Sequence, residues 1–424
     1  MRPARFGSHL AACILSRARS VGSVVAQRVQ ALGVHGSAGE SSTSGPTDLA
    51  TKGPYVARLK SRGVIRFDGP DVVHYLQGLL TNDVTKFESK TQQESAAPSP
   101  NTSAAFYPPV YSAVLSPQGR VLFDLFLYKP SAPIEKLNRS GSGPGDGNDN
   151  TPALLADVDA AALDDLLAFL KKHRLRAKVD VQDISQDLAT WQHFGGNLAE
   201  NPEEQSKVES GPIGWGGRTE EAAQSSAEAN SGGWRWFKDP RLGTLGMRGL
   251  FPSNTLPPLV EAGEEVDDEY YLLWRLEQGI PEGSIEIPRG EAIPLEYNLA
   301  GLSAISFEKG CYVGQELVAR THHRGVIRKR LMPVNFLQDN GEEAQQAVTP
   351  GAEVVDRSTG KKVGKVTTVL GPRGLALMRL EPALKQSAQL HIENNDGVSV
   401  KVMRPKWWPS EWGHEDEQQA ASSV

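Results

Sequence analysis

The chain has 424 residues, of which 39% are hydrophobic and 23% charged, and its formal net charge is −6. The negative net charge gives no general attraction to nucleic acid, and no apolar run is long enough to cross a bilayer. Two cysteines are too few for a disulfide framework or for a zinc site made of cysteines alone. We therefore expect more than one hydrophobic core and neither nucleic-acid nor membrane partners.

The first 45 residues have the composition of a targeting segment. No Asp or Glu occurs in residues 1–39, and arginine recurs among small and aliphatic residues at Arg2, Arg5, Arg17, Arg19 and Arg28. A basic, acid-free, amphipathic start is typical of a mitochondrial presequence, so we expect import into the matrix and cleavage between residues 21 and 46. The pattern leaves a chloroplast transit peptide or a disordered basic arm open as alternatives.

Several elements before residue 280 have clear signals. A helix is predicted after Gly69-Pro70-Asp71, and a hairpin from 110–115 and 121–128 around a turn with Pro and Gly. Asp159 can cap a leucine-patterned helix with cations at its end, and a further helix is predicted over 267–278. The first two helices carry these apolar and cationic residues: Val72, Val73, Leu76, Leu79 and Leu80; Leu163, Leu166, Leu167, Leu170, Lys171, Lys172 and Arg174.

Beyond residue 330 the pattern changes to short alternating runs. Such runs predict strands at 331–337, 363–370, 374–380 and 398–403. Strands of this length and spacing predict a small antiparallel β-barrel over 331–408. The polar end of the chain, 409–424, is predicted to be a disordered tail.

Polar stretches rich in Gly, Pro and Ser interrupt the region before the barrel. They are interpreted as surface insertions at 88–103, 131–150 and 195–233. The expected fold class is α+β. Mixed helices and antiparallel sheets over 46–330 precede the barrel.

The most informative stretch is the octapeptide Lys309-Gly310-Cys311-Tyr312-Val313-Gly314-Gln315-Glu316. Its cysteine is the only thiol left if Cys13 is removed with the leader. A helix is predicted from Gln315 to Arg320, and a thiol near a helix N-terminus and beside Lys309 lies where its thiolate is favoured. The alternative is a small buried residue in a tight turn, but the surrounding pattern favours a functional thiol.

Asp124 is the second chemical candidate. The period of two along 121–128 places it on one face with Leu122, Phe126 and Tyr128. If that face is buried, desolvation raises the pKa of the carboxyl and suits it to exchange a proton with a ligand nitrogen. An exposed edge-strand aspartate is equally compatible with the pattern.

Arg275 and Glu277 lie in the last turn of the helix over 267–278. An anion is unfavourable at that end, and the simplest interpretation is a solvated pair in which Arg275 offsets Glu277. His322 and His323 are adjacent, so they point in different directions and one metal rarely takes both. We expect no metal site and, with a single available cysteine, no stably bound cluster in the isolated subunit.

The octapeptide around Cys311, followed by Leu317-Val318-Ala319-Arg320-Thr321, resembles the signature of the YgfZ-type proteins, folate-binding relatives of the glycine-cleavage aminomethyltransferase. The resemblance covers about residues 55–405 and implies a folate cavity with tetrahydrofolate as the cofactor. It implies catalytic roles for Cys311 and Asp124. It implies cofactor contacts for Lys309, Tyr312, Gln315, Arg320, Gln118, Arg275 and Glu277.

Two details of the resemblance bear on chemistry. Gln118 begins the segment that turns a strand toward the pterin in this family, and Arg275 suits the glutamyl carboxylate of folate. Folate aminomethyltransferases typically carry two adjacent acids where this chain has Phe123-Asp124. That departure counts against aminomethyl transfer itself.

The resemblance implies two classes of function. In the first, the chain is a tetrahydrofolate-binding factor that uses Cys311 in the maturation of mitochondrial [4Fe-4S] proteins. Its partners would be A-type iron-sulfur scaffold proteins and recipient enzymes of the aconitase and radical-SAM (lipoyl-synthase) types. In the second, it is a folate-dependent one-carbon transferase. Because methylene transfer needs carboxylates but no thiol, Cys311 favours the first class. A thiol hydrolase would also need a histidine base and an orienting acid.

Overall fold

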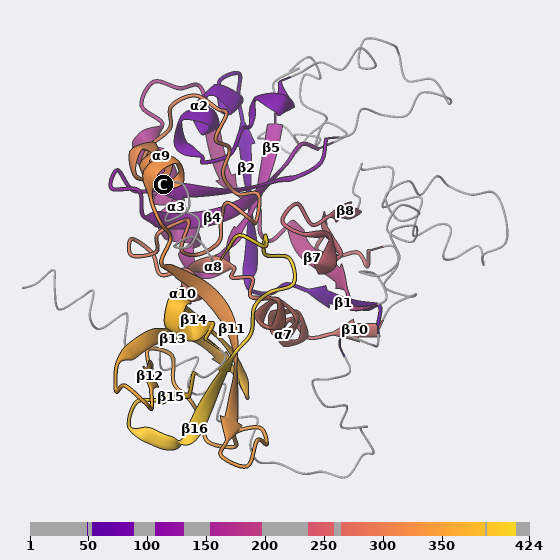
Figure 1. The fold of residues 1–424 in the computed structure, drawn as a ribbon. Coiled ribbons are helices and arrows are strands. Elements are labelled where there is room, and N and C mark those ends of the chain that lie inside the picture. Colours follow the sequence, from indigo (N-terminus) through magenta and orange to yellow (C-terminus); the bar gives the residue numbers. More distant parts are fainter. Residues whose placement is uncertain are drawn as a thin grey trace, which may run out of the picture. The chain divides into compact units, whose positions relative to one another are not determined.

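The computed structural model describes residues 49, 53–88, 107–130, 153–196, 236–257, 264–385 and 388–412 (Figure 1). The predicted leader over 1–45 and most of the predicted insertions lie outside these residues. The chain from Asp48 to Val424 forms one compact unit, and the fold below is that of its described residues.

The first sheet has five antiparallel strands in the order β3-β4-β5-β2-β6. Its elements are β2 (Arg62–Asp68), α2 (Val72–Leu79), η2 (Thr85–Phe87), β3 (Val110–Leu115), β4 (Val121–Tyr128), β5 (Ala153–Asp159), η3 (Ala160–Ala162), α3 (Leu163–His173) and β6 (Asp180–Asp183). Helices α2 and α3 share one hydrophobic core with alternate residues of β4 and β5. The predicted helices and hairpin are confirmed, and Asp159 accepts a hydrogen bond from the Ala161 amide as predicted for a cap.

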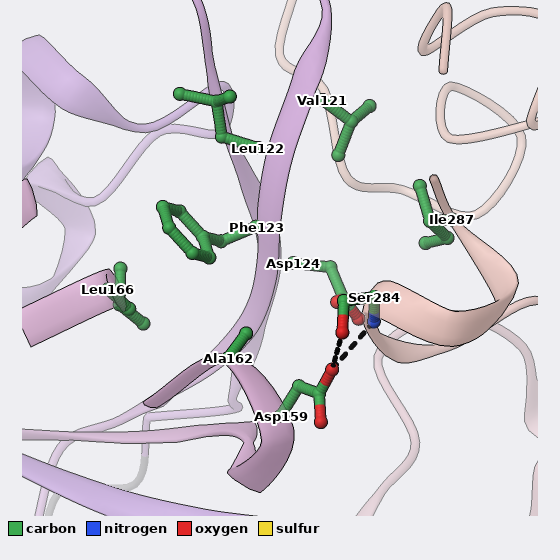
Figure 2. Close-up of a pocket in the computed structure, with 9 residues that line it drawn as sticks. All are labelled: Val121, Leu122, Phe123, Asp124, Asp159, Ala162, Leu166, Ser284 and Ile287. Atoms are coloured by element: carbon green, nitrogen blue, oxygen red, sulfur yellow. Dashed lines mark hydrogen bonds between the residues drawn. The ribbon is translucent and has the colours of Figure 1, made fainter. Parts of the chain in front are cut away.

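A β-bulge at the start of β4 changes which residues share a face. Leu115 pairs with Val121 and Val114 with Phe123, so Leu122 is the extra residue. Figure 2 shows Leu122 and Phe123 on one side of the strand and Val121 and Asp124 on the other. The predicted grouping of Asp124 with Leu122 is therefore wrong, because strict alternation does not hold through the bulge. Its grouping with Phe126 and Tyr128 holds, since both belong to the core on the Asp124 side.

The second sheet has the order β10-β1-β7-β9-β8, with β1 and β10 parallel and the other pairs antiparallel. Its elements are β1 (Tyr55–Arg58), β7 (Leu188–Phe194), β8 (Trp236–Lys238), η4 (Gly243–Leu245), β9 (Met247–Pro252) and β10 (Glu264–Val266). One face buries a small cluster that includes Trp191, Trp236 and Phe251. The other face contributes Phe194 and Leu250 to the largest core.

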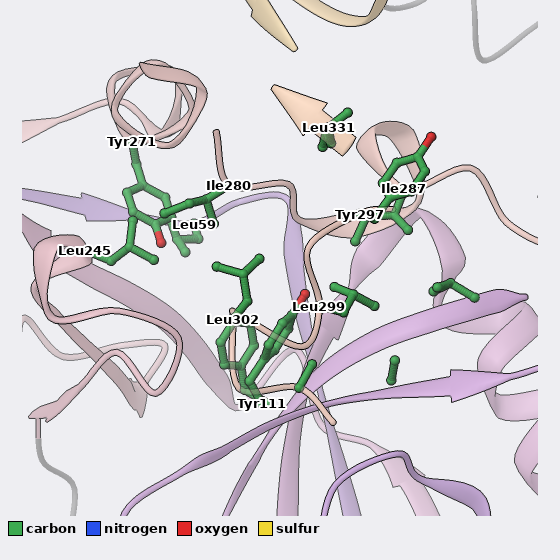
Figure 3. Packing of buried hydrophobic residues seen from close by; sticks show 14 of the residues in the cluster. Leu59, Tyr111, Leu245, Tyr271, Ile280, Ile287, Tyr297, Leu299, Leu302 and Leu331 are labelled. Carbon is green, nitrogen blue, oxygen red and sulfur yellow. The ribbon is translucent and has the colours of Figure 1, made fainter. Parts of the chain in front are cut away.

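That largest core joins the two sheets through the chain that follows the second sheet. Helices α7 (Asp268–Gln278) and α8 (Gly283–Glu286) lead into an irregular stretch that ends near Ile305. Figure 3 shows Tyr271, Ile280, Leu299 and Leu302 packed together with residues from both sheets. The predicted helix over 267–278 is confirmed, and Gly279 closes it with a left-handed φ of 73°.

The C-terminal strands form a closed barrel in the order β11-β14-β13-β12-β15-β16. Its elements are β11 (Lys329–Gln338), β12 (Glu353–Asp356), β13 (Lys362–Leu370), β14 (Arg373–Arg379), α10 (Leu380–Ala383), β15 (Leu390–Ile392) and β16 (Asn395–Val402). The predicted runs correspond to β11, β13, β14 and β16. Strands β12 and β15 were not predicted, because each is short and has a bulge in its pairing that interrupts the alternation.

A group of tryptophans extends the ordered structure beyond the predicted end of the barrel at residue 408. The guanidinium carbon of Arg330 lies 3.5 Å from the ring centroid of Trp412, and the rings of Trp408 and Trp412 are 5.5 Å apart. Trp407 Nε1 donates to the carbonyl oxygen of Gln278 at 2.8 Å. The described structure thus continues to Trp412, and these contacts connect the barrel end to α7.

Candidate functional site

The cysteine loop, residues 309–314, leads directly into α9 (Gln315–Arg324). The predicted helix after Gly314 is confirmed, and it continues beyond the predicted Arg320. Cys311 is exposed and its thiol is free, whereas the next residue, Tyr312, is buried. The loop therefore presents the sulfur to solvent and anchors itself through the neighbouring ring.

Lys309 fastens the cysteine loop to the end of α2. Its Nζ donates to the carbonyl oxygens of Gln77, Leu80 and Asn82 at 2.8, 2.7 and 3.0 Å. A cation at a helix C-terminus also interacts favourably with the helix dipole. Burial lowers the pKa of Lys309 to about 8, and the charge of Asp83 opposes that shift. All three donors of the ammonium are occupied, so Lys309 holds the cysteine loop against the end of α2. The effect of its charge on the Cys311 thiolate stays a prediction.

Replacing Lys309 by methionine should lower the free energy of unfolding by about 2–3 kcal/mol, because three carbonyl groups lose a charged donor. The cysteine loop should also become more sensitive to limited proteolysis. Denaturant titration of the variant measures the first effect. Lys401→Met, which removes an exposed lysine on β16, is the matched control and should leave the free energy of unfolding nearly unchanged. Equal stabilities for the two variants would contradict the assignment.

Two glycines bring the β3–β4 turn against the start of α9. A Cβ on Gly119 would lie 2.6 Å from the Cβ of Leu317, and a Cβ on Gly314 would lie 2.8 Å from that of Leu115 and collide with the Ser116 carbonyl oxygen. Both glycines have left-handed φ angles, 75° and 81°. Only glycine fits both the backbone conformation and the space, so this contact fixes the base of the cysteine loop.

The other motif residues serve different surroundings. Burial raises the pKa of Tyr312 to about 12. Gln315 is half-buried, and its backbone N–H donates to the Tyr312 carbonyl oxygen. Arg320 is exposed on α9. His322 stacks on the exposed Phe307 with ring centroids 3.7 Å apart. Within the described part of the chain, no group of three or more His, Cys, Asp and Glu could hold a metal ion.

A buried ionic network lies between the two sheets. Arg248 is fully buried and pairs with Asp157 at 2.7 Å and Glu282 at 3.1 Å. Arg241 pairs with Glu282 and with Asp239, each at 2.7 Å. Burial opposes ionisation of Glu282, but Arg248 and the other arginines hold its pKa well below the usual range. The network joins four cations to four carboxylates: Arg62, Arg241, Arg248 and Arg275 to Asp157, Asp239, Glu282 and Glu286.

Asp124 is a further carboxyl at the margin of this network. It is buried, so of the two alternatives that the sequence left open the buried one holds. It accepts hydrogen bonds from the Gly283 amide at 3.1 Å and the Tyr111 hydroxyl at 3.3 Å. Arg62 Nη1 lies 3.9 Å from its Oδ2. Burial raises the pKa of Asp124, the charge of Glu282 adds to the rise, and Arg62 opposes it. Desolvation is the main cause of this rise, the effect expected for a carboxyl on a buried face.

Replacing Asp124 by asparagine should change how stability depends on pH. The pKa of Asp124 is higher in the folded protein than its unfolded value of about 3.9. The protonated carboxyl therefore contributes its full share to stability below about pH 3.9, and this contribution is lost as pH rises through the folded pKa. The variant lacks this loss, so its free energy of unfolding should rise relative to that of the wild type between acid and neutral pH. Denaturant titrations across this range test the difference, with the exposed Asp267→Asn as control. Parallel curves for Asp124→Asn and wild type would contradict it.

Arg275 and Glu277 do not form the predicted pair with one another. Arg275 is buried, and its Nη1 and Nη2 both donate to Glu286, at 2.7 and 2.9 Å. Glu277 lies 3.6 Å from Arg373 of the barrel strand β14. The guanidinium fork that was expected to receive the glutamyl carboxylate of folate is already occupied within the protein.

The space beside Asp124 is small. Figure 2 shows the cavity between Asp124, Asp159 and Ser284, whose amide and hydroxyl both donate to Asp159. Its volume is about 10 Å³. One water needs roughly that much, whereas small-molecule sites typically offer about 300–1,000 Å³. This cavity has the size of about one water molecule.

The β3–β4 hairpin connects the cysteine loop to the interior around Asp124. Gln118 is exposed at its tip, the adjacent Gly119 touches α9, and Asp124 lies further along β4. The structure therefore places Gln118 near the start of α9 and Asp124 in the interior. Cys311 stands at the surface on the α9 side of the hairpin. The ionic network was not predicted from the sequence. It joins short pairs such as Asp239 and Arg241 to residues as distant as Asp157 and Arg248, and no local spacing connects the whole set.

Known proteins resemble both parts of this fold. Residues 328–410 match the family described as CAF17, C-terminal β-barrel domain. The chain is 35% identical over 355 residues to the mouse protein named iron-sulfur cluster assembly factor IBA57, mitochondrial, with 83% of this chain and 85% of that protein covered. The human protein of the same name is 35% identical over 359 residues, with the same coverage of 83% and 85%.

A solved structure supports the same architecture. The crystal structure of glycine cleavage system aminomethyltransferase T from Bartonella henselae superimposes with a TM-score of 0.52, covering 84% of this chain and 86% of that one. Sequence identity is 14%, so the likeness concerns the fold alone. The predicted α+β class with a C-terminal barrel is confirmed.

Proposed function

Because the chain belongs to the IBA57 family of mitochondrial iron-sulfur cluster assembly factors, we propose that Cys311 serves as a ligand to a cluster held by a partner protein. The observation that carries this proposal is the exposed thiol on a loop fixed to α2 and to the β3–β4 turn. Clusters usually need several thiolate ligands, and only one is available on the described surface. The remaining ligands come from the partner.

The chemical step is a ligand exchange. The Cys311 thiol loses its proton to solvent, and the thiolate donates an electron pair to an iron of the cluster. One water or partner thiolate leaves that iron, and no atom changes oxidation state. The fixed loop lowers the entropy cost of forming the shared complex, because the thiolate is already held in an outward position.

The proposed role also includes specific partners and a compartment. The partners are A-type scaffold proteins that carry the cluster and recipient [4Fe-4S] enzymes of the aconitase and lipoyl-synthase types. The relatives are named mitochondrial, and we place the reaction in the matrix. The exposed Phe307, stacked on His322 of α9, offers an aromatic contact for a partner, which protein interfaces favour.

Tetrahydrofolate has no step in this mechanism, since Arg275 already binds Glu286 and the cavity beside Asp124 is small. When bound, this cofactor supplies one-carbon chemistry. The resemblance still makes it the ligand to test, by calorimetric titration of the purified protein. The proposed thiolate step does not depend on that result.

Anaerobic gel filtration with an A-type scaffold tests the proposal. The scaffold is loaded with a [2Fe-2S] cluster, and visible absorbance reports where the cluster elutes. The wild-type chain should form a coloured complex with the loaded scaffold and none with the cluster-free scaffold. Cys311→Ser should lose the complex, and Ser303→Ala, an exposed site on the preceding chain, should keep it. A coloured complex with Cys311→Ser would overturn the assignment.

A further inference from the structure

A second surface, separate from the cysteine loop, concentrates positive charge at the end of α3. We call residues 171–178 the basic loop. Its exposed cations are Lys171, Lys172, Arg174, Arg176 and Lys178, in a chain whose formal net charge is −6. None of them forms a salt bridge with another described residue. Among them stands Leu175, which is 88% exposed.

The backbone of the basic loop holds Leu175 outward. Leu175 has a φ of 47°, a left-handed conformation that is uncommon for residues other than Gly, Asn and Asp. The Ala177 amide donates to the Arg174 carbonyl at 2.9 Å, and Arg174 Nη1 donates to the Val179 carbonyl at 3.2 Å. These bonds close a tight turn around the leucine. Its exposure thus follows from a defined, strained conformation.

The far end of the basic loop is fixed as well. The Lys178 amide donates to Asp71 Oδ2 at 2.7 Å, and a Cβ on Gly69 would collide with the Lys178 carbonyl oxygen. Asp71 therefore uses its carboxylate on the backbone. Asp180, two residues beyond the loop, accepts a hydrogen bond from Gln182.

Stabilisation of the helix explains only part of this charge. Lys171 and Lys172 lie in the last turn of α3, where cations complement the helix dipole. Arg174, Arg176 and Lys178 lie beyond that turn, and the dipole does not account for Leu175 at all. An exposed leucine with cations on both sides in the sequence suits the lipid headgroup region, where the cations can bind phosphates and the leucine can contact acyl chains.

We propose that the basic loop is a peripheral contact with an anionic phospholipid bilayer, in which Leu175 enters the headgroup layer and the cations bind lipid phosphates. Protein interfaces are depleted in lysine and enriched in aromatic residues and arginine. The basic loop has three lysines, two arginines and no Phe, Tyr or Trp, so lysine and the missing aromatic residues favour lipid over protein. A fluid headgroup layer also requires no fixed complementary surface. No helix of the described residues is long and apolar enough to span a membrane. The proposed contact departs from the expectation of no membrane partner.

Co-sedimentation of the full chain with vesicles tests the proposal. Vesicles of phosphatidylcholine with phosphatidylglycerol should bind the wild type, and rising salt should weaken the binding. The combined change K171Q/K172Q/R176Q should reduce the partition coefficient about 100-fold, at roughly tenfold for every 1.4 kcal/mol. Leu175→Asn suits the left-handed backbone and should reduce partition about tenfold. Leu256→Asn, at another exposed leucine, is the matched control and should have no effect.

All variants keep the basic leader, so its contribution cancels in each comparison. Binding of Leu175→Asn equal to wild type would overturn the insertion of the leucine. Equal binding to vesicles of phosphatidylcholine alone would overturn the anionic preference. If the charge variant binds vesicles normally but no longer binds a polyglutamate peptide, the surface is for an acidic protein and the membrane assignment is wrong.

Discussion

Replacing Arg248 by methionine should lower the free energy of unfolding by about 3–5 kcal/mol, the usual cost of breaking a buried ion pair on one side. Arg248 is fully buried and donates to Asp157, Gln192 and Glu282. Methionine fills much of the volume but leaves Asp157 and Glu282 with less positive charge around them. The variant should therefore unfold at a lower denaturant concentration, measured by tryptophan fluorescence.

An exposed ion pair provides the control for this experiment. Lys60 lies 3.1 Å from Asp267, and both side chains are largely exposed. Lys60→Met should leave the free energy of unfolding nearly unchanged, since solvent screens such pairs. If Arg248→Met and Lys60→Met have the same small effect, the network is not what holds the two sheets together.

Replacing Gly314 by alanine should cost about 3 kcal/mol of stability and disturb the cysteine loop. The φ of 81° disfavours any side chain, and the added Cβ would also meet the backbone of the β3–β4 turn and Leu115. Backbone atoms cannot move aside as a flexible side chain can. The turn or the first turn of α9 must therefore shift.

A substitution at Gly290 separates the cost of the backbone conformation from the cost of the close contact. It has a similar φ of 76°, and a Cβ there would meet no atom within 4 Å. Gly290→Ala should therefore show only the conformational cost, about 1–2 kcal/mol. Denaturant titration of both variants gives the difference that belongs to the close contact. Equal costs would mean that the turn and α9 are not tightly packed against one another.

Local patterns were enough to predict the elements that carry the site. The leucine spacing of α3, the turn of the β3–β4 hairpin and the αL glycine that ends α7 each depend on a few neighbouring residues. The start of α9 was also predicted, because Gly314 marks a helix start. In all these cases the determining interactions lie within one or two turns of chain. The exposure of Cys311 was not predicted, since a buried residue in a tight turn was left open as the alternative.

The remaining features depend on residues that are distant in the sequence. Asp157 and Arg248 are 91 residues apart, and Lys309 bonds to Leu80 across 229 residues. No spacing rule connects such positions, so the sequence suggested that Lys309 acts on its neighbour Cys311. The bulge that separates Leu122 from Asp124 likewise depends on the pairing of β4 with β3.

The central claim is that the Cys311 thiol itself is required for maturation of mitochondrial [4Fe-4S] proteins. The most direct measurement is aconitase activity in cells that lack the protein and carry either the wild-type chain or Cys311→Ser at equal abundance. Serine keeps the size of the side chain and removes the soft ligand atom. We predict normal aconitase activity with the wild-type chain and activity near that of the null cells with Cys311→Ser. Full activity with Cys311→Ser would contradict the account.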